Sequence, residues 1–207
     1  MLVLVIGDLH IPQRASNLPS QFRKLLIPGK IQRIICTGNV CDQATYNYLR
    51  AICPNIDIVQ GDFDEFYNAT SLPSKNLEDA PRSPKQDVTN QTWPQSKIVE
   101  IEGFRIGIVH GHQMCPANGD VDSLVYISRY MDVDLLCSGN THRFEAYEED
   151  GRFFVNPGSA TGVFSALEHN PTPSFVLMDM KESHLVAYVY QLVDNKVSVD
   201  KIEYTKP

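Results

Sequence analysis

The sequence predicts an α/β fold that begins with a mainly parallel sheet. Three observations predict it: short aliphatic runs that end in polar turns, helical spacings between those runs, and closely spaced strand patterns in the second half. Strands that alternate with helices imply right-handed crossovers and parallel pairing, whereas strands joined by short turns imply hairpins. We therefore expect both kinds of strand pairing in this chain.

The first half of the chain alternates strand and helix. The continuous aliphatic run Leu2–Ile6 ends at Gly7-Asp8, which is typical of a strand buried on both faces. Apolar residues at helical spacing predict a helix over Leu18–Ile27. By the same criteria, we expect strands at 31–36 and 56–59 and a short helix at 44–52.

The pattern changes to closely spaced strands from residue 97 onward. We expect a hairpin over 98–109, a helix over 121–131 and a buried strand over 133–137. Five further strands are expected at 143–148, 152–155, 174–180, 185–192 and 197–204. Gly151 and the pair Asp194-Asn195 supply turn residues between these strands.

The segment 66–96 does not fit either pattern. It holds four of the 13 prolines, together with many small polar residues and little periodicity. We expect it to be a long, mobile surface insertion in a single domain that spans residues 1–207. Trp93, the only tryptophan, either pins this loop back onto the body of the protein or forms an exposed anchor for a partner.

The composition excludes several classes of protein. The chain has 207 residues, of which 43% are hydrophobic, and this is enough for a sizeable core. The net charge of -7 argues against nucleic acid and against anionic membrane surfaces as partners. We expect no direct membrane insertion, because no apolar run reaches the roughly 18 residues that a membrane helix needs. Five scattered cysteines and no recognisable signal peptide predict a cytoplasmic protein with free thiols.

Polar residues of the kinds that ligate metals follow five of the expected strands. The pairs are Asp8 and His10, Asn39 and Asp42, Asp62 and Asp64, His110 and His112, and Asn140 and His142. One such residue alone is usually a turn or cap residue. Five pairs at strand ends instead predict a shared metal-type site, because ligand sites of open α/β sheets form outside the carboxyl ends of the strands.

The segments that carry these pairs resemble the five motifs of the calcineurin-like metallophosphoesterases. They are Gly7–His10, Gly38–Asp42, Gly61–Asp64, His110–His112 and Gly139–His142. The resemblance implies a metallophosphoesterase-like αββα sandwich, in which two mixed β-sheets are flanked by helices. In that family two divalent metals share a bridging Asp and activate a water, while a His of the third motif assists the leaving group.

Three departures from the family pattern argue against catalysis. Asn39 stands at the bridging Asp, Phe63 at the catalytic His, and Asn140 at a metal-binding His. The resemblance therefore implies no catalytic residue, no required cofactor and a vestigial metal site formed by Asp8, His10, Asn39, Asp62, His110, Asn140 and His142. We expect at most one weakly bound Zn or Mn ion, at Asp8, His10, Asn39 and His142. The alternative is a weak metal-dependent phosphoesterase.

A narrower resemblance, to the small-subunit family of the retromer complex, covers almost the whole chain. It rests on the segments 7–12, 25–30, 36–39, 61–65, 110–113, 153–162 and 173–179. This resemblance implies a non-catalytic scaffold subunit in endosome-to-Golgi and endosome-to-plasma-membrane protein transport. Such a protein is cytoplasmic and reaches endosomal membranes through its partners.

The same resemblance implies two binding faces. The first, called here the solenoid face, binds the large α-solenoid retromer subunit (vacuolar protein sorting-associated protein 35); its residues are Ile11, Pro12, Phe63, Met114, Cys115 and Pro116. The second, called here the regulator patch, binds regulatory proteins such as Rab GTPase-activating proteins; its residues are Leu2, Leu25, Leu26, Leu177, Tyr188 and Tyr190. Taken alone, the 114–116 stretch could also be an ordinary loop, and the two tyrosines could be half-buried sheet residues.

Overall fold

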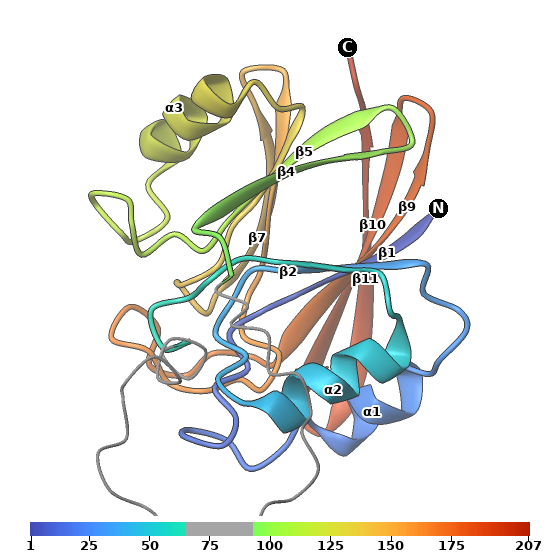
Figure 1. Ribbon diagram of the computed structural model, residues 1–207, viewed down its shortest axis with the longest axis vertical. Coiled ribbons are helices and arrows are strands. Elements are labelled where there is room, and N and C mark those ends of the chain that lie inside the picture. The colour runs from blue at the N-terminus through green and yellow to red at the C-terminus, as the bar shows by residue number, and fades with distance from the viewer. Residues whose placement is uncertain (65–92) are drawn as a thin grey trace, which may run out of the picture.

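The computed structural model describes residues 1–64 and 93–207. In this part of the chain, two mixed β-sheets pack against each other and helices lie on the outside (Figure 1). Helices α1 (Ser20–Leu25) and α2 (Gln43–Ile52) lie together beside the first sheet, and α3 (Val121–Met131) lies beside the second. The predicted fold class, an αββα sandwich of mixed sheets, is therefore confirmed.

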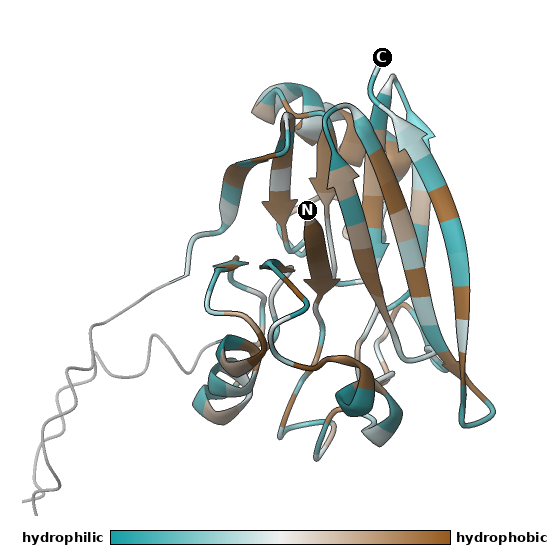
Figure 2. Cartoon of the chain, turned by 90° about the vertical axis from the view of Figure 1, so that its right-hand side faces the viewer, coloured by the Kyte–Doolittle hydropathy of each residue, from teal (hydrophilic) through white to brown (hydrophobic). Residues whose placement is uncertain are grey.

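The first sheet has the strand order β11-β10-β9-β1-β2-β3. Its strands are β1 (Leu2–Ile6), β2 (Arg33–Cys36), β3 (Ile56–Ile58), β9 (Ser174–Lys181), β10 (His184–Val193) and β11 (Lys196–Thr205). Strands β1, β2 and β3 run parallel, whereas β9 is antiparallel to β1, and β10 and β11 continue the antiparallel half. The long strands of this half show bands of alternating hydropathy in Figure 2, as expected where one face is more buried than the other.

The second sheet has the strand order β4-β5-β6-β8-β7. Its strands are β4 (Ser96–Ile101), β5 (Phe104–Val109), β6 (Leu135–Cys137), β7 (Phe144–Glu149) and β8 (Arg152–Pro157). The central strands β5, β6 and β8 are parallel, and the outer strands β4 and β7 pair antiparallel with their neighbours. The hairpin expected over 98–109 is therefore present.

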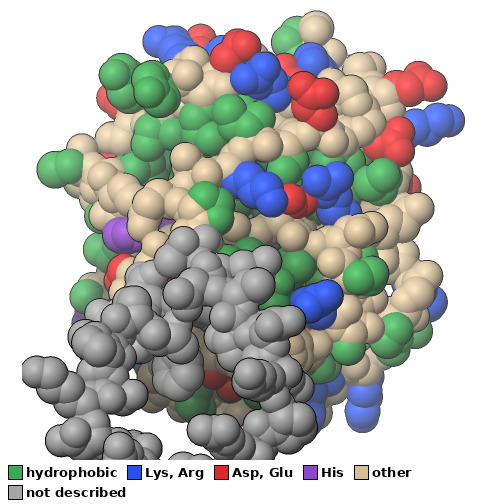
Figure 3. All heavy atoms as spheres, in the orientation of Figure 1, with side chains coloured by type: hydrophobic (Ala, Val, Ile, Leu, Met, Phe, Trp, Pro, Cys, Tyr) green, Lys and Arg blue, Asp and Glu red, His purple; other side chains and the backbone are tan. Residues whose placement is uncertain are grey.

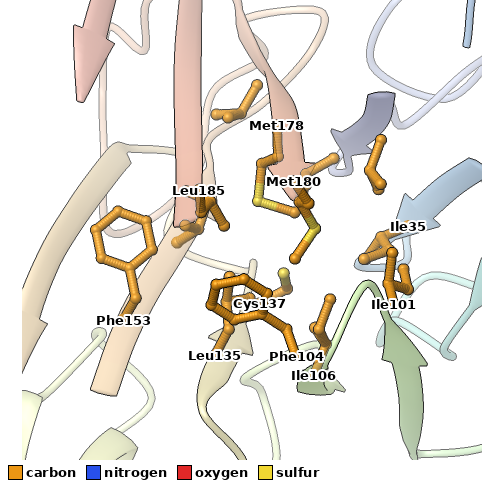
Figure 4. Packing of buried hydrophobic residues seen from close by; sticks show 14 of the residues in the cluster. Ile35, Ile101, Phe104, Ile106, Leu135, Cys137, Phe153, Met178, Met180 and Leu185 are labelled. Carbon is orange, nitrogen blue, oxygen red and sulfur yellow. The ribbon is translucent and has the colours of Figure 1, made fainter. Parts of the chain in front are cut away.

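The main hydrophobic core lies between the two sheets. Met178, Met180 and Leu185 come from the first sheet and face residues of the second, among them Phe104 and Phe153 (Figure 4). These side chains are at most 2% exposed. Each such burial contributes roughly 1.5–3 kcal/mol, so this layer is a main source of stability.

A second core layer lies between the first sheet and its helices. Alternation along β1 sends Leu4 and Ile6 to this outer face, whereas Val3 and Val5 point into the core between the sheets. On the outer face they join Phe22 of α1 in one cluster. A continuous aliphatic run was the correct signal for this strand, because both of its faces are covered.

Four of the predicted elements are shorter than expected. The strand expected over 31–36 begins at Arg33, and the strand expected over 56–59 ends at Ile58. The other two are shortened for local reasons. The helix expected over Leu18–Ile27 extends only from Ser20 to Leu25, because Pro19 is its N-cap and Leu26 leaves helical geometry with ψ of 69°. The strand expected from Val133 begins at Leu135, because the Val133 amide still bonds to the Ser128 carbonyl at the end of α3.

The predicted insertion lies mostly outside the described residues. Residues 66–92 of the segment 66–96 belong to that part, so its expected mobility stays a prediction. Trp93 is described, and its side chain is only 7% exposed, with its ring centroid 5.6 Å from that of Tyr46 in α2. This burial favours the interpretation in which Trp93 pins the end of the segment onto the body of the protein.

Candidate functional site

Loops at the carboxyl ends of strands from both sheets bring polar side chains together. The side chains of Asp8, His10, Asn39, Asp64, His110 and His142 are each at most 2% exposed. Asp62 is exposed, and Asn140 and His112 are half-buried at the margin of the group. A cavity of about 300 Å³ opens over these residues. On the molecular surface, histidine atoms appear at the left of Figure 3, below the apolar side chains around α3.

The backbone around the site is bent into an unusual conformation. Asp8, His10, Asn39, Asn140 and His142 all have φ between 48° and 72°. This left-handed region costs a residue with a side chain on the order of 1 kcal/mol or more, and such strain concentrates at functional sites. This backbone conformation directs these side chains toward one another.

The first of two ligand groups consists of Asp8, His10 and His142. One ligand atom from each lies within 4.8 Å of the others. The His142 Nδ1 lies 2.7 Å from the Val163 carbonyl, so Nδ1 carries the proton and the Nε2 lone pair faces the pocket. The His10 Nε2 is 3.1 Å from the His142 Nε2. Burial, assisted by the charges of His142 and Arg14, lowers the pKa of His10 to about 3.

These three residues fit a single divalent ion. A neutral His10 is the form that ligates metals, and two imidazoles with one carboxylate are a donor set that zinc accepts, with water completing the shell. His142 is oriented by its bond to a carbonyl, as metal-ligating histidines usually are. When bound, such an ion would supply Lewis acidity at this end of the cavity.

The second ligand group consists of Asp62, His110 and His112. His110 donates from Nδ1 to the Thr37 carbonyl at 2.7 Å, and its Nε2 lies 3.2 Å from the Asp62 carboxylate. Burial opposes the charged form of His110, but the bond to Asp62 and the charge of Asp8 outweigh it and raise the His110 pKa. Burial also works against the Asp62 carboxylate, yet the hydrogen bonds from His110 and Asn39 hold the Asp62 pKa below its usual range.

The Asn39 side chain lies between the two ligand groups. Its Nδ2 is 3.3 Å from Asp8 Oδ1 and from His10 Nε2, 2.9 Å from Asp62 Oδ1 and 3.0 Å from His110 Nε2. Its Oδ1 accepts the backbone N–H of Phe63 at 2.9 Å. An amide nitrogen has no lone pair for a metal, so in this orientation Asn39 donates to the ligand groups and ligates nothing.

Two hydrogen bonds fix the position of Asn140. Its side chain donates to the Ala117 carbonyl at 2.8 Å, and its backbone N–H donates to Asp8 Oδ2 at 2.9 Å. The second bond orients the Asp8 carboxylate. Asn140 therefore supports the first ligand group through its backbone, whereas a role of its side chain as a ligand stays a prediction.

Phe63 and Arg14 form one wall of the cavity. The Phe63 ring meets His10 edge to face, with centroids 5.2 Å apart, and the Arg14 guanidinium lies 4.3 Å from the same ring centroid. Arg14 also donates to the Phe164 carbonyl at 3.0 Å. A phenyl ring transfers no proton, so the position that the resemblance gives to a catalytic His is occupied by a group without acid–base chemistry.

Two residues of the strand-end pairs have roles in the site that the expected set of metal ligands did not include. His112 completes the second ligand group, although the resemblance implied no ligand role for it; the spacing in His110-Gly111-His112 was the available signal. Asp64 is 1% exposed and accepts the backbone N–H groups of Asn39, Cys41 and Gly61 at 2.7–2.9 Å. It fixes the loop that carries Asn39. Asp42, in contrast, is the N-cap of α2.

Of the expected solenoid face, only Phe63 lines this cavity, whereas Ile11 and Pro12 line a separate pocket. Phe63 is 42% exposed and lines the cavity, while Cys115 and Pro116 are exposed on the loop after His112. Ile11 is only 9% exposed. Met114 and Cys115 also line a groove of about 420 Å³ whose other side is formed by α3 residues, including the 71%-exposed Tyr126. The structure thus brings apolar side chains to the surface beside the ligand groups.

The expected regulator patch lies on the outer face of the first sheet. Leu177 of β9 is directly opposite both Leu4 of β1 and Tyr188 of β10, and Tyr190 stacks on Phe175 with centroids 4.7 Å apart. Leu2, Leu177, Tyr188 and Tyr190 are half-buried, and Leu25 is 45% exposed. Leu26 is only 2% exposed, so it packs in the core beneath the patch and offers no surface of its own.

Comparisons with known proteins identify the family of this chain. Residues 1–183 match the calcineurin-like phosphoesterase superfamily domain. Vacuolar protein sorting-associated protein 29 of Schizosaccharomyces pombe is 44% identical over 211 residues, with all of both chains covered. The structure of vacuolar protein sorting 29 from Cryptosporidium parvum has a TM-score of 0.85 at 41% identity, over 99% of this chain and 98% of that chain.

A third relative was solved with a metal ion. Wild-type Vps29 from Entamoeba histolytica, complexed with Zn²⁺, has a TM-score of 0.81 at 39% identity, over 98% of this chain and 99% of that chain. The similarity in each case extends over nearly the whole length of both proteins. The chain therefore belongs to the calcineurin-like phosphoesterase superfamily and, within it, to the family of vacuolar protein sorting-associated protein 29.

Proposed function

We propose that this protein is a non-catalytic scaffold subunit of retromer, acting in protein transport from endosomes to the Golgi and the plasma membrane. The observation that carries the proposal is the 44% identity to a vacuolar protein sorting-associated protein over the full length of both chains. A relationship over the whole length of both chains supports a shared role.

The residues of the cavity support the absence of catalysis. Phe63 offers no proton to a leaving group, and Asn39 contributes neither the charge nor the lone pair that a bridging carboxylate brings. The surviving first ligand group, Asp8, His10 and His142, supports weak binding of one Zn or Mn ion with no catalytic role. The zinc complex of the Entamoeba relative is consistent with such an ion.

The large α-solenoid subunit, vacuolar protein sorting-associated protein 35, is the partner we assign to the solenoid face. Exposed Cys115 and Pro116 and half-exposed Phe63 support this assignment, since apolar side chains on a polar rim are typical of interface centres. Met114 adds a flexible side chain that adapts to an irregular helical surface.

Regulatory proteins such as Rab GTPase-activating proteins are the partners we assign to the regulator patch. Leu177, Tyr188 and Tyr190 support it, because half-buried tyrosines beside a leucine combine apolar contact with hydroxyl donors. The patch and the solenoid face use different residues, so both partners are expected to bind at once.

We place the protein in the cytoplasm and, through its partners, on endosomal membranes. In the described parts of the chain, none of the helices combines the length and the apolar character needed to cross a bilayer. Attachment through a partner is consistent with the net charge of -7, which gives no electrostatic attraction to anionic lipid.

Co-purification with the large subunit and with a regulator tests the two faces. Cys115→Asp is expected to abolish capture of the large subunit and leave regulator binding unchanged, with Cys115→Ser as the control for loss of the thiol. Leu177→Glu is expected to do the reverse. Loss of both partners with either variant, or of neither with both, would contradict the two-face proposal.

A weak metal-dependent phosphoesterase is the second candidate, and the survival of both ligand groups favours it. Hydrolysis of p-nitrophenyl phosphate with added Mn²⁺ or Zn²⁺ separates the two functions. We expect no metal-dependent turnover by the wild type. The triple variant Asn39→Asp, Phe63→His, Asn140→His shows whether the cavity accepts the substrate once the missing groups return. Robust turnover by the wild type would reject the non-catalytic proposal.

A further inference from the structure

The two ends of the Asn39 side-chain amide face different groups in this site. Its Oδ1 accepts the Phe63 backbone N–H at 2.9 Å, and its Nδ2 lies within 3.3 Å of polar atoms from both ligand groups. Because a backbone N–H only donates, the oxygen must face Phe63 and the NH₂ must face the ligand groups. The orientation of the amide is thus determined by its hydrogen bonds.

This orientation suits a site without an ion. The NH₂ group has two hydrogens and donates to the Asp8 and Asp62 carboxylates. An ion that used Asn39 as a ligand would need its oxygen, so the amide would have to turn over. The NH₂ would then face the Phe63 N–H, two donors would oppose each other, and the Phe63 amide would lose its acceptor.

A carboxylate at position 39 would not meet this conflict. One oxygen would keep the Phe63 N–H, and the other would face the ligand groups with a lone pair. The difference between Asn and Asp here is therefore more than one unit of charge. With Asn39, ligation of an ion and attachment of Phe63 exclude each other.

We infer that Asn39 couples ion occupancy to the position of Phe63. The ion-free site holds the Phe63 backbone N–H by a hydrogen bond, and ligation of a divalent ion by Asn39 breaks that bond and releases Phe63. Phe63 is packed between His10 and Arg14, so its release also loosens the Arg14 contact at the cavity wall. Phe63 belongs to the solenoid face, so, if the proposed function holds, a divalent ion modulates binding of the large subunit.

Amide hydrogen exchange on the full chain alone tests the coupling, so its outcome does not depend on the proposed partner. Zinc binding is established in parallel by competition with a fluorescent chelator. In the wild type, saturating zinc is expected to speed exchange of the Phe63 amide about tenfold, as loss of one hydrogen bond implies. In Asn39→Asp, zinc is expected to bind more tightly while the Phe63 amide stays protected.

The Asn39 and Cys41 amides are the internal control, because both donate to Asp64 and are expected to stay protected in either protein. An unchanged exchange rate of the Phe63 amide in the zinc-loaded wild type would overturn the inference, since the first ligand group would then hold the ion without Asn39. Absence of zinc binding at about 1 mM would also overturn it. The wild-type experiment decides the question even if the variant does not fold.

Discussion

The Asp64 carboxylate accepts the backbone N–H of Asn39 at 2.7 Å, in a place where Asp64 is almost completely buried. The same carboxylate also accepts from Cys41 and Gly61. It therefore joins the loop after β2 to the loop after β3 and fixes the left-handed conformation of Asn39. The geometry of the cavity depends on this carboxylate as much as on the ligand residues.

Asp64→Ala is accordingly expected to destabilise the fold strongly. Three buried N–H groups would lose a charged acceptor, and we expect the free energy of unfolding to fall by about 3 kcal/mol. Asp42→Ala, which removes a single N-cap bond from α2, should cost only about 1 kcal/mol. Urea unfolding of both variants gives the comparison. Equal losses would show that Asp64 is no more than an ordinary loop residue.

The Asp57 carboxylate is expected to make stability depend on pH. Asp57 is 5% exposed and pairs with Arg33 at 2.6 Å and with Lys97 of β4 at 2.7 Å, so it links the edges of the two sheets. Burial opposes its charge, but these hydrogen bonds outweigh burial and lower the Asp57 pKa. Since the unfolded chain takes up this proton first, stability should fall as the pH falls below about 4.

Asp57→Asn tests this contribution. The substitution should lower the free energy of unfolding by about 1–2 kcal/mol at pH 7. The loss is modest because Arg33 and Lys97 are partly exposed, so water can solvate their charges. It should also flatten the acid limb of the stability profile. Glu203→Gln, which affects the exposed pair with Lys201, is the matched control and should change little. An acid limb that keeps its slope in Asp57→Asn would assign the pH dependence to other groups.

Phe175 is expected to stabilise the packing beneath the regulator patch. It is fully buried, meets Phe22 edge to face at 4.8 Å and stacks under Tyr190 at 4.7 Å. Phe175→Ala should lower the free energy of unfolding by about 3–5 kcal/mol through the cavity it leaves. Phe164→Ala, at a side chain 55% exposed, should cost less than about 0.5 kcal/mol. Thermal unfolding of the two variants measures the difference, and a small effect at Phe175 would mean that the layer repacks freely.

The first ligand group is expected to bind the tighter ion. His10→Ala should weaken zinc binding by about tenfold or more, because it removes a neutral imidazole from a three-residue donor set. His112→Ala, at a half-buried histidine of the second group, should leave the tighter site nearly unchanged. Isothermal titration with zinc measures both. A larger loss in His112→Ala would assign the main site to Asp62, His110 and His112 instead.

The sequence was sufficient for most of the individual helices and strands because their signals are local. The buried run Leu2–Ile6 and the helix Val121–Met131 were predicted with their observed bounds. The resemblance to a known family supplied the two-sheet arrangement, which periodicity alone did not determine. Pro19 and Leu26 show where local reasoning failed, because backbone geometry at the helix ends shortened α1.

The site was harder to predict because its contacts are long-range. The positions of the strand ends predicted that Asp8 and His142 lie near each other. The sequence did not indicate that Asp64 accepts three backbone N–H groups, or that Asn39 turns its side-chain nitrogen toward the ligand groups. Burial likewise separates Leu26, which is core, from Leu25, its exposed neighbour. Such distinctions depend on which side chains of other elements cover a residue.

The most direct measurement of the central claim is the reactivity of Cys115 toward a maleimide. Of the five cysteines, Cys115 is exposed and the other four are buried, so labelling of the native chain reports this one position on the solenoid face. The account predicts that adding the large α-solenoid subunit slows Cys115 labelling at least about tenfold, since interface centres exclude solvent. A complex that forms while Cys115 keeps its free labelling rate would contradict it.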